Sequence, residues 1–480
     1  MKELLRLTKV KRYGKVYTPD YLVNIILDKG HYINGNINKK HVIDNSCGDG
    51  QFLTYIVDRY CKDYLINNND LIELKKQLET FIHGIEIDND ELEICRHRCD
   101  DIVKKYGLNK VLWNFVNDDS MKINIYDSKM DFVIGNPPYV RIHNLIKEPN
   151  LIKNYLFSNK GMTDLYIIFY EIGIKMLNKN GILCYITPSS FFTSLAGLNM
   201  RLFLSEYKLI ESVCDLKHFQ AFNATVYTTI ICLNKSKKNE CVEYYEFDEK
   251  KLKPYFIEKI SHNDYFIKNN YYFGPKQKLI FLKKVLLSNK TTNILVKNGY
   301  ATLSDKIFIN DFDFESKFII PVIKASKGEL KKIFYPYDKE NFLIDELVLK
   351  KDLKMYNYLK FNKNNLLKKN HDISSKNCWY AFGRSQGIKD TYKDKIAINS
   401  LIKTTSDLKI VNAPIGTGVY SGLYVVSDKK HFPKIKKALN DNEFGLYISL
   451  LGKYKNGGYY TFSSKDVKKY LDYKLKNEEI

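Results

Sequence analysis

Four short apolar segments in the first third of the chain each end in polar residues, and helix-like sequence lies between them. The segments are residues 42–44, 81–88, 111–116 and 132–134. Such alternation is typical of a parallel sheet in which every strand is followed by a crossover helix. Because parallel strands end at one edge of the sheet, the polar residues after them are expected to lie together there. The pattern predicts an α/β fold with a ligand site at this edge.

The fourth segment ends in Gly135-Asn136-Pro137-Pro138-Tyr139. Two consecutive prolines fix φ near −65° and remove two backbone donors. A residue that precedes proline, as Asn136 does, is disfavoured in the helical conformation. We therefore predict a stiff turn that presents an amide side chain, bare carbonyl groups and an aromatic ring at the strand end.

The first two segments end in acids. Asp44 is followed by the loop Ser46-Cys47-Gly48-Asp49-Gly50 and an amphipathic helix, and the second segment contains Glu86. Glycines in such a loop let a ligand approach the backbone closely. The loop lacks the three spaced glycines of the dinucleotide fingerprint and the lysine of a P-loop, so we interpret it as a site for another nucleoside-type ligand. An acid at the position of Glu86 typically binds ribose hydroxyls.

With 480 residues the chain exceeds the usual size of a single hydrophobic core, and two domains are expected. The composition changes at the lysine-rich segment 235–239, which predicts domains at residues 1–238 and 239–480. A formal net charge of +21 favours a polyanionic partner such as nucleic acid. Aromatic residues, 14% of the chain, add surfaces on which bases stack.

The nine cysteines are scattered and odd in number, and the chain shows neither a secretory signal nor an apolar run long enough to span a membrane. This predicts a reduced, cytoplasmic protein of bacterial type that does not enter a membrane. Cys95, His97 and Cys99 are close in sequence, but no second ligand pair follows nearby. No metal site is predicted.

In this order, the motifs resemble those of the gamma-class N6-adenine DNA methyltransferases of the TaqI-like, type II restriction-modification kind. Family motif X matches Tyr17-Thr18-Pro19, motif I matches Asp44 through Gly50, and motif IV matches Asn136 through Tyr139. The resemblance implies a Rossmann-like S-adenosylmethionine-dependent methyltransferase domain, followed by a mixed α+β target-recognition domain. One departure is Asn45, where the family often has proline.

The resemblance also implies how the target base is held. The Asn136 side-chain oxygen and the Pro137 carbonyl would accept the hydrogens of the adenine amine, while Tyr139 and Phe222 would stack on the flipped base. Phe219, in the same segment as Phe222, is the alternative for the second ring. From sequence alone, Thr18 is expected to cap the helix that follows it, with Pro19 at the first helical position.

The implied cofactor is S-adenosyl-L-methionine. Glu86 would bind its ribose, Asp119 its adenine amino group, with Asp118 as the alternative, and Asp44 would lie near its methionine end. The complete set of implied cofactor-binding residues is Tyr17, Thr18, Asp44, Ser46, Cys47, Gly48, Gly50, Glu86, Ile87, Asp119 and Asn136.

The implied partner is double-stranded DNA, bound by a monomer, with a separately encoded restriction endonuclease or none. Alternatives are an RNA or protein-glutamine methyltransferase with the same Asn-Pro-Pro-Tyr site, and a DNA-specificity protein without catalysis. The basic second half favours DNA as the substrate over protein. Arg384 is interpreted either as a DNA contact or as a structural arginine.

Overall fold

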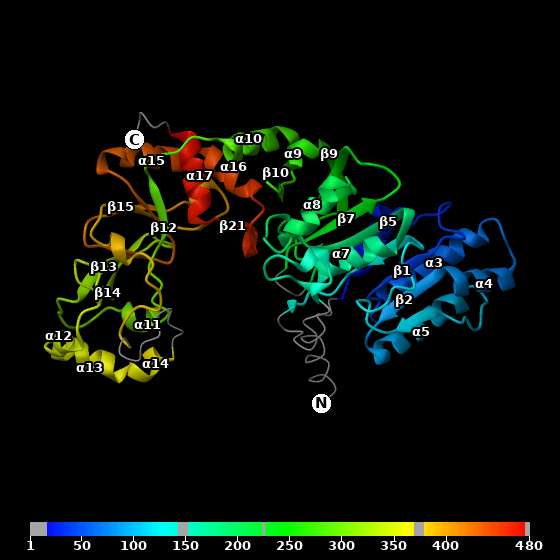
Figure 1. Cartoon of the computed structure of the whole chain (residues 1–480), viewed down its shortest axis with the longest axis horizontal. Helices are drawn as coiled ribbons and strands as arrows, with labels where there is room; N and C mark the ends of the chain where they lie inside the picture. The colour runs from blue at the N-terminus through cyan, green and yellow to red at the C-terminus, as the bar shows by residue number, and fades with distance from the viewer. Residues whose placement is uncertain (1–16, 143–151, 223–225, 369–378, 476–480) are drawn as a thin grey trace. The chain divides into compact units, whose positions relative to one another are not determined.

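A nine-stranded sheet forms the centre of the first of two units, residues 1–280, in the computed structural model (Figure 1). The structure describes residues 17–142, 152–222, 226–368 and 379–475. The strands of the sheet are β1 (Val42–Asp44), β2 (Ile82–Glu86), β3 (Asn114–Asn117), β4 (Met130–Gly135), β5 (Leu177–Pro188), β6 (Ile210–Asp215), β7 (Thr228–Asn234), β8 (Cys241–Asp248) and β9 (Lys253–Ser261). A small hairpin pairs β10 (Phe266–Ile267) with β11 (Asn270–Tyr271).

The strand order is β3-β2-β1-β4-β5-β7-β6-β8-β9. Strands β1 to β5 pair in parallel, as the four strand-and-helix repeats predict, and β7 inserts antiparallel between β5 and β6. This arrangement confirms the predicted α/β, Rossmann-like methyltransferase fold. It also brings the ends of β1, β2, β3 and β4 to one edge of the sheet.

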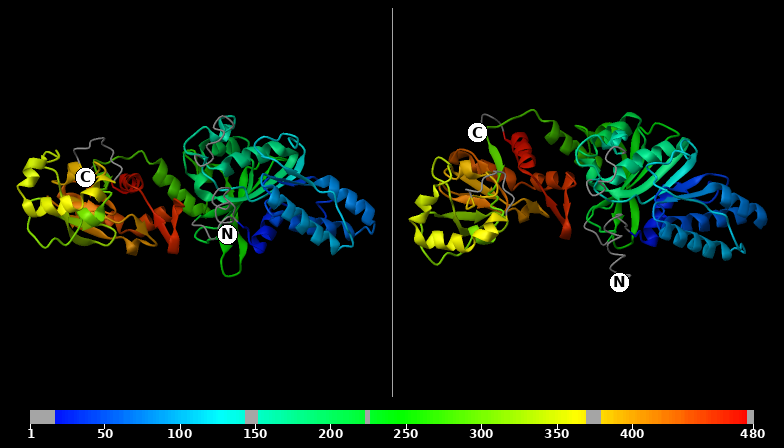
Figure 2. Two further views of the ribbon diagram at one scale, coloured as in Figure 1. Left: turned by 90° about the horizontal axis from the view of Figure 1, so that it is seen from below. Right: turned by 60° about the horizontal axis from the view of Figure 1, so that its bottom comes forward.

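Helices cover both faces of the sheet. Those of the first unit are α2 (Asp20–Lys29), α3 (Gln51–Leu65), α4 (Leu71–Phe81), α5 (Asn89–Lys104), α7 (Leu165–Met176), α8 (Leu198–Glu206) and α9 (His262–Tyr265). Helices α3, α4 and α5, blue to cyan, lie together beside β1 and β2 in Figures 1 and 2.

Alternate residues of β4 face opposite layers, as expected for a strand buried on both sides. Ile134 belongs to the core cluster that includes residues of α2, α3 and α5. On the other face, a Cβ added at Gly173 of α7 would lie 3.3 Å from Val133 and 2.5 Å from Leu183. Gly173 therefore lets α7 pack directly on the sheet.

The predicted domain boundary at residue 238 falls inside the first unit. Strand β8 pairs in parallel with β6 and antiparallel with β9, so residues 241–261 extend the same sheet. The lysine-rich segment 235–239 lies between β7 and β8, two strands of that sheet. This lysine-rich segment is therefore a connection between strands. The division between the two units falls near residue 280, within α10 (Lys276–Leu287).

The second unit, residues 281–480, mixes three small sheets with short helices, as the predicted α+β domain does (Figure 1). The sheets have the orders β12-β19-β15-β17, β14-β13-β18 and β16-β21-β20. Their strands are β12 (Leu295–Asn298), β13 (Ile319–Lys324), β14 (Glu329–Phe334), β15 (Lys395–Ile398), β16 (Leu401–Ile402), β17 (Ile410–Ala413), β18 (Gly418–Tyr420), β19 (Leu423–Val426), β20 (Tyr454–Lys455) and β21 (Tyr459–Thr461).

The helices of the second unit are α11 (Asp305–Phe308), α12 (Glu346–Lys350), α13 (Leu353–Phe361), α14 (Lys363–Leu367), α15 (Phe432–Leu439), α16 (Asn442–Leu450) and α17 (Ser464–Lys474). An aromatic core that includes Tyr300, Phe334 and Phe382 gives this unit its own hydrophobic centre. Across the described parts of both units, every helix is too short or too polar to cross a membrane.

Candidate active site

The ends of β1 and β4 meet at the predicted ligand edge. The two strands pair in parallel, with Val42 opposite Phe132, and this register brings Asp44 beside Gly135. A Cβ added at Gly135 would lie only 2.6 Å from Asp44 Oδ1. Glycine at 135 therefore permits the close approach of the acid-and-glycine loop to the Asn-Pro-Pro-Tyr turn.

The loop after β1 is shaped by two glycines with positive φ, 54° at Gly48 and 87° at Gly50. A Cβ at Gly50 would meet Cys95 Sγ at 2.7 Å, whereas one at Gly48 would meet no described atom within 4 Å. The space beside Gly48 leaves room for a ligand against the backbone. Buried Cys47 packs in the core beneath this loop.

Glu86, at the end of β2, ties this loop to the sheet. Its Oε2 accepts a hydrogen bond from the Gly48 amide at 2.9 Å, and its Oε1 accepts one from the Asp88 amide at 3.0 Å. A carboxylate has about four acceptor positions, so Glu86 keeps capacity for a ribose hydroxyl. Its neighbour Ile87 is exposed, as expected of an apolar side chain that would cover a bound ligand.

Asn45, the departure from the family motif, supports the loop from within the domain. Its Oδ1 accepts a hydrogen bond from the Tyr185 hydroxyl at 2.8 Å, and its carbonyl accepts one from Ser120 Oγ at 2.5 Å. The amide thereby takes over the rigid support that a proline would give, through buried hydrogen bonds. Sequence reasoning missed Tyr185 and Ser120 because neither lies in a recognisable motif.

Ser46 carries a buried hydroxyl that makes no hydrogen bond with any described residue, while its amide donates to Asp44 Oδ1 at 3.0 Å. A buried polar group without a partner is costly, so the position suits a polar ligand. Together with the open space at Gly48 and the acids at the strand ends, this donor set fits S-adenosyl-L-methionine.

The Asp44 carboxyl is almost fully buried, and this burial raises its pKa to about 8, although the Ser46 amide opposes the shift. Burial favours the neutral form of an acid because the charged form loses its hydration. A cationic group beside Asp44 would restore its charge. Such a site suits the ammonium group at the methionine end of the cofactor.

The two candidate acids after β3 differ in exposure. Asp118 is exposed and Asp119 is half-buried, and Asp119 Oδ1 accepts a hydrogen bond from the Met121 amide at 2.9 Å. The next residue, Ser120, contacts the backbone of Asn45. This connection brings the end of β3 to the loop after β1, and the role of Asp119 at the cofactor adenine stays a prediction.

Thr18 does not cap α2, contrary to the sequence prediction. The cap residue is Pro19 and the helix begins at Asp20. The buried Thr18 hydroxyl instead accepts a hydrogen bond from Asn136 Nδ2 at 3.0 Å. This contact holds the Asn136 side chain beside Thr18, whose predicted place is near the cofactor. The preceding residue, Tyr17, is 64% exposed.

Tyr139 and Phe222, the predicted stacking pair, lie side by side. Their ring centroids are 6.1 Å apart with an interplanar angle of 71°, and Tyr166 approaches Tyr139 from another side at 6.2 Å. The Tyr139 hydroxyl donates to the Ile186 carbonyl at 3.0 Å. Phe219 instead packs on Phe247 of β8 at 4.7 Å. Phe222 is thus the ring beside Tyr139.

In the second unit, Arg384 is exposed on a loop that the backbone holds firmly. The Arg384 amide donates to the Ala301 carbonyl at 3.1 Å, and Gln386 Nε2 donates to the Gly299 carbonyl at 2.6 Å. The neighbouring Phe382 belongs to the aromatic core. Because the backbone of this loop is already fixed, the loop can present Arg384 to a partner without the entropy cost of ordering its backbone.

Comparison with known proteins shows which enzymes this chain is similar to. Residues 7–222 match the family model described as Eco57I restriction-modification methylase. The type II methyltransferase M.BstVI of Geobacillus stearothermophilus is 24% identical over 392 residues, which cover 70% of this chain and 68% of that protein. The type II restriction enzyme and methyltransferase RM.Eco57I of Escherichia coli is 25% identical over 348 residues, covering 62% of this chain but only 35% of that protein.

The fold is also that of a solved structure, the type IIL restriction-modification enzyme MmeI in complex with DNA. The TM-score is 0.60 at 14% sequence identity, with 96% of this chain and 64% of that chain covered. The likeness extends over both units, so the arrangement of a methyltransferase fold followed by an α+β unit is shared.

Fold and site together define the first unit as an S-adenosyl-L-methionine-dependent methyltransferase. More specifically, residues 7–222 match the model of the Eco57I restriction-modification methylases, and the chain is similar to type II methyltransferases. The predicted resemblance to restriction-modification methyltransferases and the predicted cofactor, S-adenosyl-L-methionine, are thereby confirmed. The assignment to the gamma class and to the TaqI-like group stays a prediction.

Proposed function

We propose that this protein is a site-specific DNA methyltransferase that transfers a methyl group from S-adenosyl-L-methionine to the N6 amine of adenine. The observation that carries the proposal is the hydrogen bond from Asn136 Nδ2 to Thr18. This bond holds the amide of the Asn-Pro-Pro-Tyr turn in place. The close approach of Gly135 to Asp44 brings the same turn beside the loop that is proposed to bind the cofactor.

An exocyclic amine on adenine is a poor nucleophile because its lone pair is delocalised into the ring. Two acceptors that hold both amine hydrogens favour a pyramidal nitrogen, whose lone pair then points at the methyl group. Asn136 Oδ1 and the Pro137 carbonyl are the acceptors in this proposal. Bound S-adenosyl-L-methionine supplies an electrophilic methyl group on a sulfonium. The protein contributes positioning and electrostatic preorganisation.

The target amine lies inside the duplex, so the adenine must leave the stack, at a cost of a few kcal/mol. Stacking on an aromatic ring contributes about 1–3 kcal/mol per base and offsets much of that cost. Tyr139 and Phe222 now contact each other edge to face. We infer that the flipped base displaces one ring from the other and stacks against Tyr139.

The second unit is the proposed DNA-binding unit. Its exposed Arg384 lies on a fixed loop, and a hollow of about 840 Å³ elsewhere in the unit is lined by the lysines Lys317, Lys332, Lys351 and Lys354 against two acids. With a net charge of +21 for the chain, these groups suit contacts to phosphates, which position a duplex and carry no sequence information. A separately encoded endonuclease and a monomeric state belong to the same proposal.

A methyl-transfer assay with tritium-labelled S-adenosyl-L-methionine tests the function on bacterial DNA, RNA and protein in parallel. We expect label in DNA alone. Asn136→Ala should lower the rate about 100- to 1000-fold, the usual effect of losing one group that stabilises the transition state, whereas the exposed Asn180→Ala should leave it unchanged. Equal labelling by Asn136→Ala and the wild type would reject the catalytic site. Label in RNA or protein alone would reject DNA as the substrate.

A further inference from the structure

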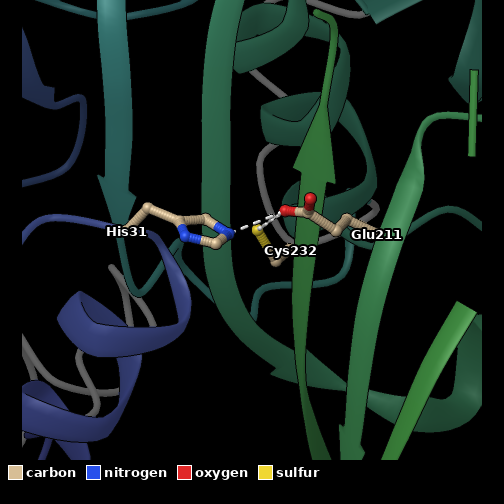
Figure 3. A group of neighbouring side chains, drawn as sticks. All are labelled: His31, Glu211 and Cys232. Carbon is tan, nitrogen blue, oxygen red and sulfur yellow. Dashed lines mark hydrogen bonds and ion pairs between the residues drawn. The ribbon is translucent and has the colours of Figure 1, made fainter. Parts of the chain in front are cut away.

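Three potential metal ligands converge in the first unit, apart from the residues of the candidate active site. His31 follows α2, Glu211 lies on β6 and Cys232 lies on β7 (Figure 3). Cys232 pairs with Cys184 of β5, and both belong to the core cluster that contains the buried residues of α2, so the group lies on the face of the sheet that α2 covers. The methyl-transfer chemistry uses none of these residues.

The ligand atoms have nearly the spacing of a tetrahedral zinc site. His31 Nε2 lies 2.8 Å from Glu211 Oε2, Cys232 Sγ lies 3.7 Å from the same oxygen, and all three ligand atoms are within 4.8 Å of one another. Zinc bonds of about 2.0 Å to nitrogen and oxygen and about 2.3 Å to sulfur, at tetrahedral angles, imply separations of roughly 3.3 Å and 3.5 Å. Side-chain shifts on the order of 1 Å would admit the ion.

The two oxygens of Glu211 have different surroundings. Oε1 is held by Lys237 Nζ at 3.0 Å and by Asn234 Nδ2 at 3.2 Å, while Oε2 faces the imidazole and the thiol. Metal-binding carboxylates are commonly oriented in this way by hydrogen bonds from outside the ligand set. Cys232 Sγ, at hydrogen-bond distance from Oε2, brings the third ligand atom to the same point.

His31 has a φ of 58° because it follows the C-cap of α2, Gly30. The Tyr32 amide donates to the Leu27 carbonyl at 2.9 Å, the bond of a helix C-terminal turn in which such a residue takes the left-handed conformation. The conformation directs the ring at Glu211 while leaving the side chain 46% exposed. A metal ion can therefore enter from solvent. With three protein ligands, a water molecule can fill the fourth position of a zinc ion.

We propose that His31, Glu211 and Cys232 form a zinc site. Sulfur, nitrogen and oxygen ligands in tetrahedral array favour Zn²⁺ over Mg²⁺ or Ca²⁺, which take oxygen ligands. The ion would fasten the end of α2 to β6 and β7. The other end of α2 follows Thr18, which holds the amide of Asn136, so the site would stabilise the helix from which that contact begins.

The test measures zinc in the full chain after removal of metal with a chelator, reloading and gel filtration. We expect the wild type to retain one equivalent that both His31→Ala and Cys232→Ser lose. His97→Ala and Cys241→Ser change an exposed histidine and an exposed cysteine in the same unit, and should retain it. Binding of S-adenosyl-L-methionine identifies variants that are folded.

Two further measurements separate the site from adventitious binding. Cobalt substitution should produce a sulfur-to-cobalt absorption band in the wild type and in Cys241→Ser, and no such band in Cys232→Ser. Zinc should raise the melting temperature of the wild type and leave that of His31→Ala unchanged. This comparison changes only a half-exposed histidine and leaves the buried cysteine in place. Failure of the reloaded wild type to retain zinc would overturn the proposal, as would retention of zinc at the wild-type level by His31→Ala and Cys232→Ser.

Discussion

At the scale of single residues, the contact between Thr18 and Asn136 links two distant motifs. The hydroxyl of Thr18 is buried and accepts from the amide nitrogen of Asn136 at 3.0 Å. In the proposed mechanism Thr18 is a positioning group, because its hydroxyl holds the side chain of Asn136 in place. An error in the orientation of that side chain affects the rate more than cofactor binding.

Thr18→Val should reduce kcat for methyl transfer about tenfold, because a buried donor on Asn136 loses its partner at a cost of about 1–3 kcal/mol. Thr18→Ser keeps the hydroxyl and should restore most of the rate. Steady-state kinetics with a binding isotherm for the cofactor provide the measurement. A large loss of cofactor affinity with unchanged kcat would contradict the positioning role.

Asp44 makes cofactor binding depend on pH. Its pKa, about 8 before binding, lies above the ordinary value of about 3.9, so the carboxyl is mostly protonated at pH 7. A cationic ligand favours the ionised form, and binding should then release close to one proton. The affinity for S-adenosyl-L-methionine should fall as the pH drops below 8.

Calorimetry at pH 7 in buffers with different ionisation enthalpies measures the released proton. Asp44→Asn cannot ionise and should release fewer protons than the wild type by nearly one, which separates its contribution from that of the cofactor's own amine. Equal proton release by the two proteins would mean that Asp44 is not the group that responds.

At the scale of elements, the site depends on the adjacency of β1 and β4. A methyl group at position 135 would lie 2.6 Å from Asp44 Oδ1. Gly135→Ala should therefore destabilise the protein by about 1–3 kcal/mol, as overpacking commonly does, and should weaken cofactor binding. Denaturant unfolding and a cofactor titration measure both effects.

A double-mutant cycle tests the stated cause. Asp44→Gly removes the carboxylate that the new methyl would meet, so Gly135→Ala should cost less in that background, with a coupling of at least about 0.5 kcal/mol. Additive effects of the two substitutions would show that the strain at Gly135 arises elsewhere.

Elements of the first unit were predictable because their signals are local. An apolar run that ends in Asp44, Glu86 or Asn136 predicts both a strand and the polar residue at its end from local sequence. Parallel pairing then brings these strand ends together. The start of α2 at Asp20, with Pro19 as its cap residue, was not predictable from local preference, because the Thr18 hydroxyl is used by a residue 118 positions away. Long-range contacts override capping preferences in this way.

The proposed zinc ligands show the same limit more strongly. His31, Glu211 and Cys232 have no spacing that a sequence pattern could identify, and only the antiparallel insertion of β7 between β5 and β6 brings the last two together. The prediction that the chain lacks a metal site rested on local spacing alone. A prediction from local spacing cannot identify ligands that come from three separate elements.

At the scale of the whole molecule, two units have separate cores, and the sheet of the first includes β8 and β9. The boundary at residue 238 was predicted from the lysine-rich composition of residues 235–239. Such a composition is found in exposed surface segments as often as in domain linkers. A fragment that ends at residue 275 should fold and bind S-adenosyl-L-methionine without methylating DNA. A fragment that ends at residue 238 leaves an edge of β6 unpaired and should aggregate.

Circular dichroism, gel filtration and a cofactor titration on the two fragments check this expectation. A soluble, cofactor-binding fragment of residues 1–238 would show that β8 and β9 are dispensable to the fold. DNA methylation by residues 1–275 would show that the second unit is not needed for the proposed activity.

The central claim is that the Asn136 site methylates the amine of adenine in DNA. Mass spectrometry of nucleosides from the DNA of a host without its own adenine methyltransferases tests it most directly. Expression of the wild type should produce N6-methyldeoxyadenosine, and expression of Asn136→Ala should produce none. Methylated cytosine in place of methylated adenine, or methylated adenine at equal levels with both proteins, would contradict the account.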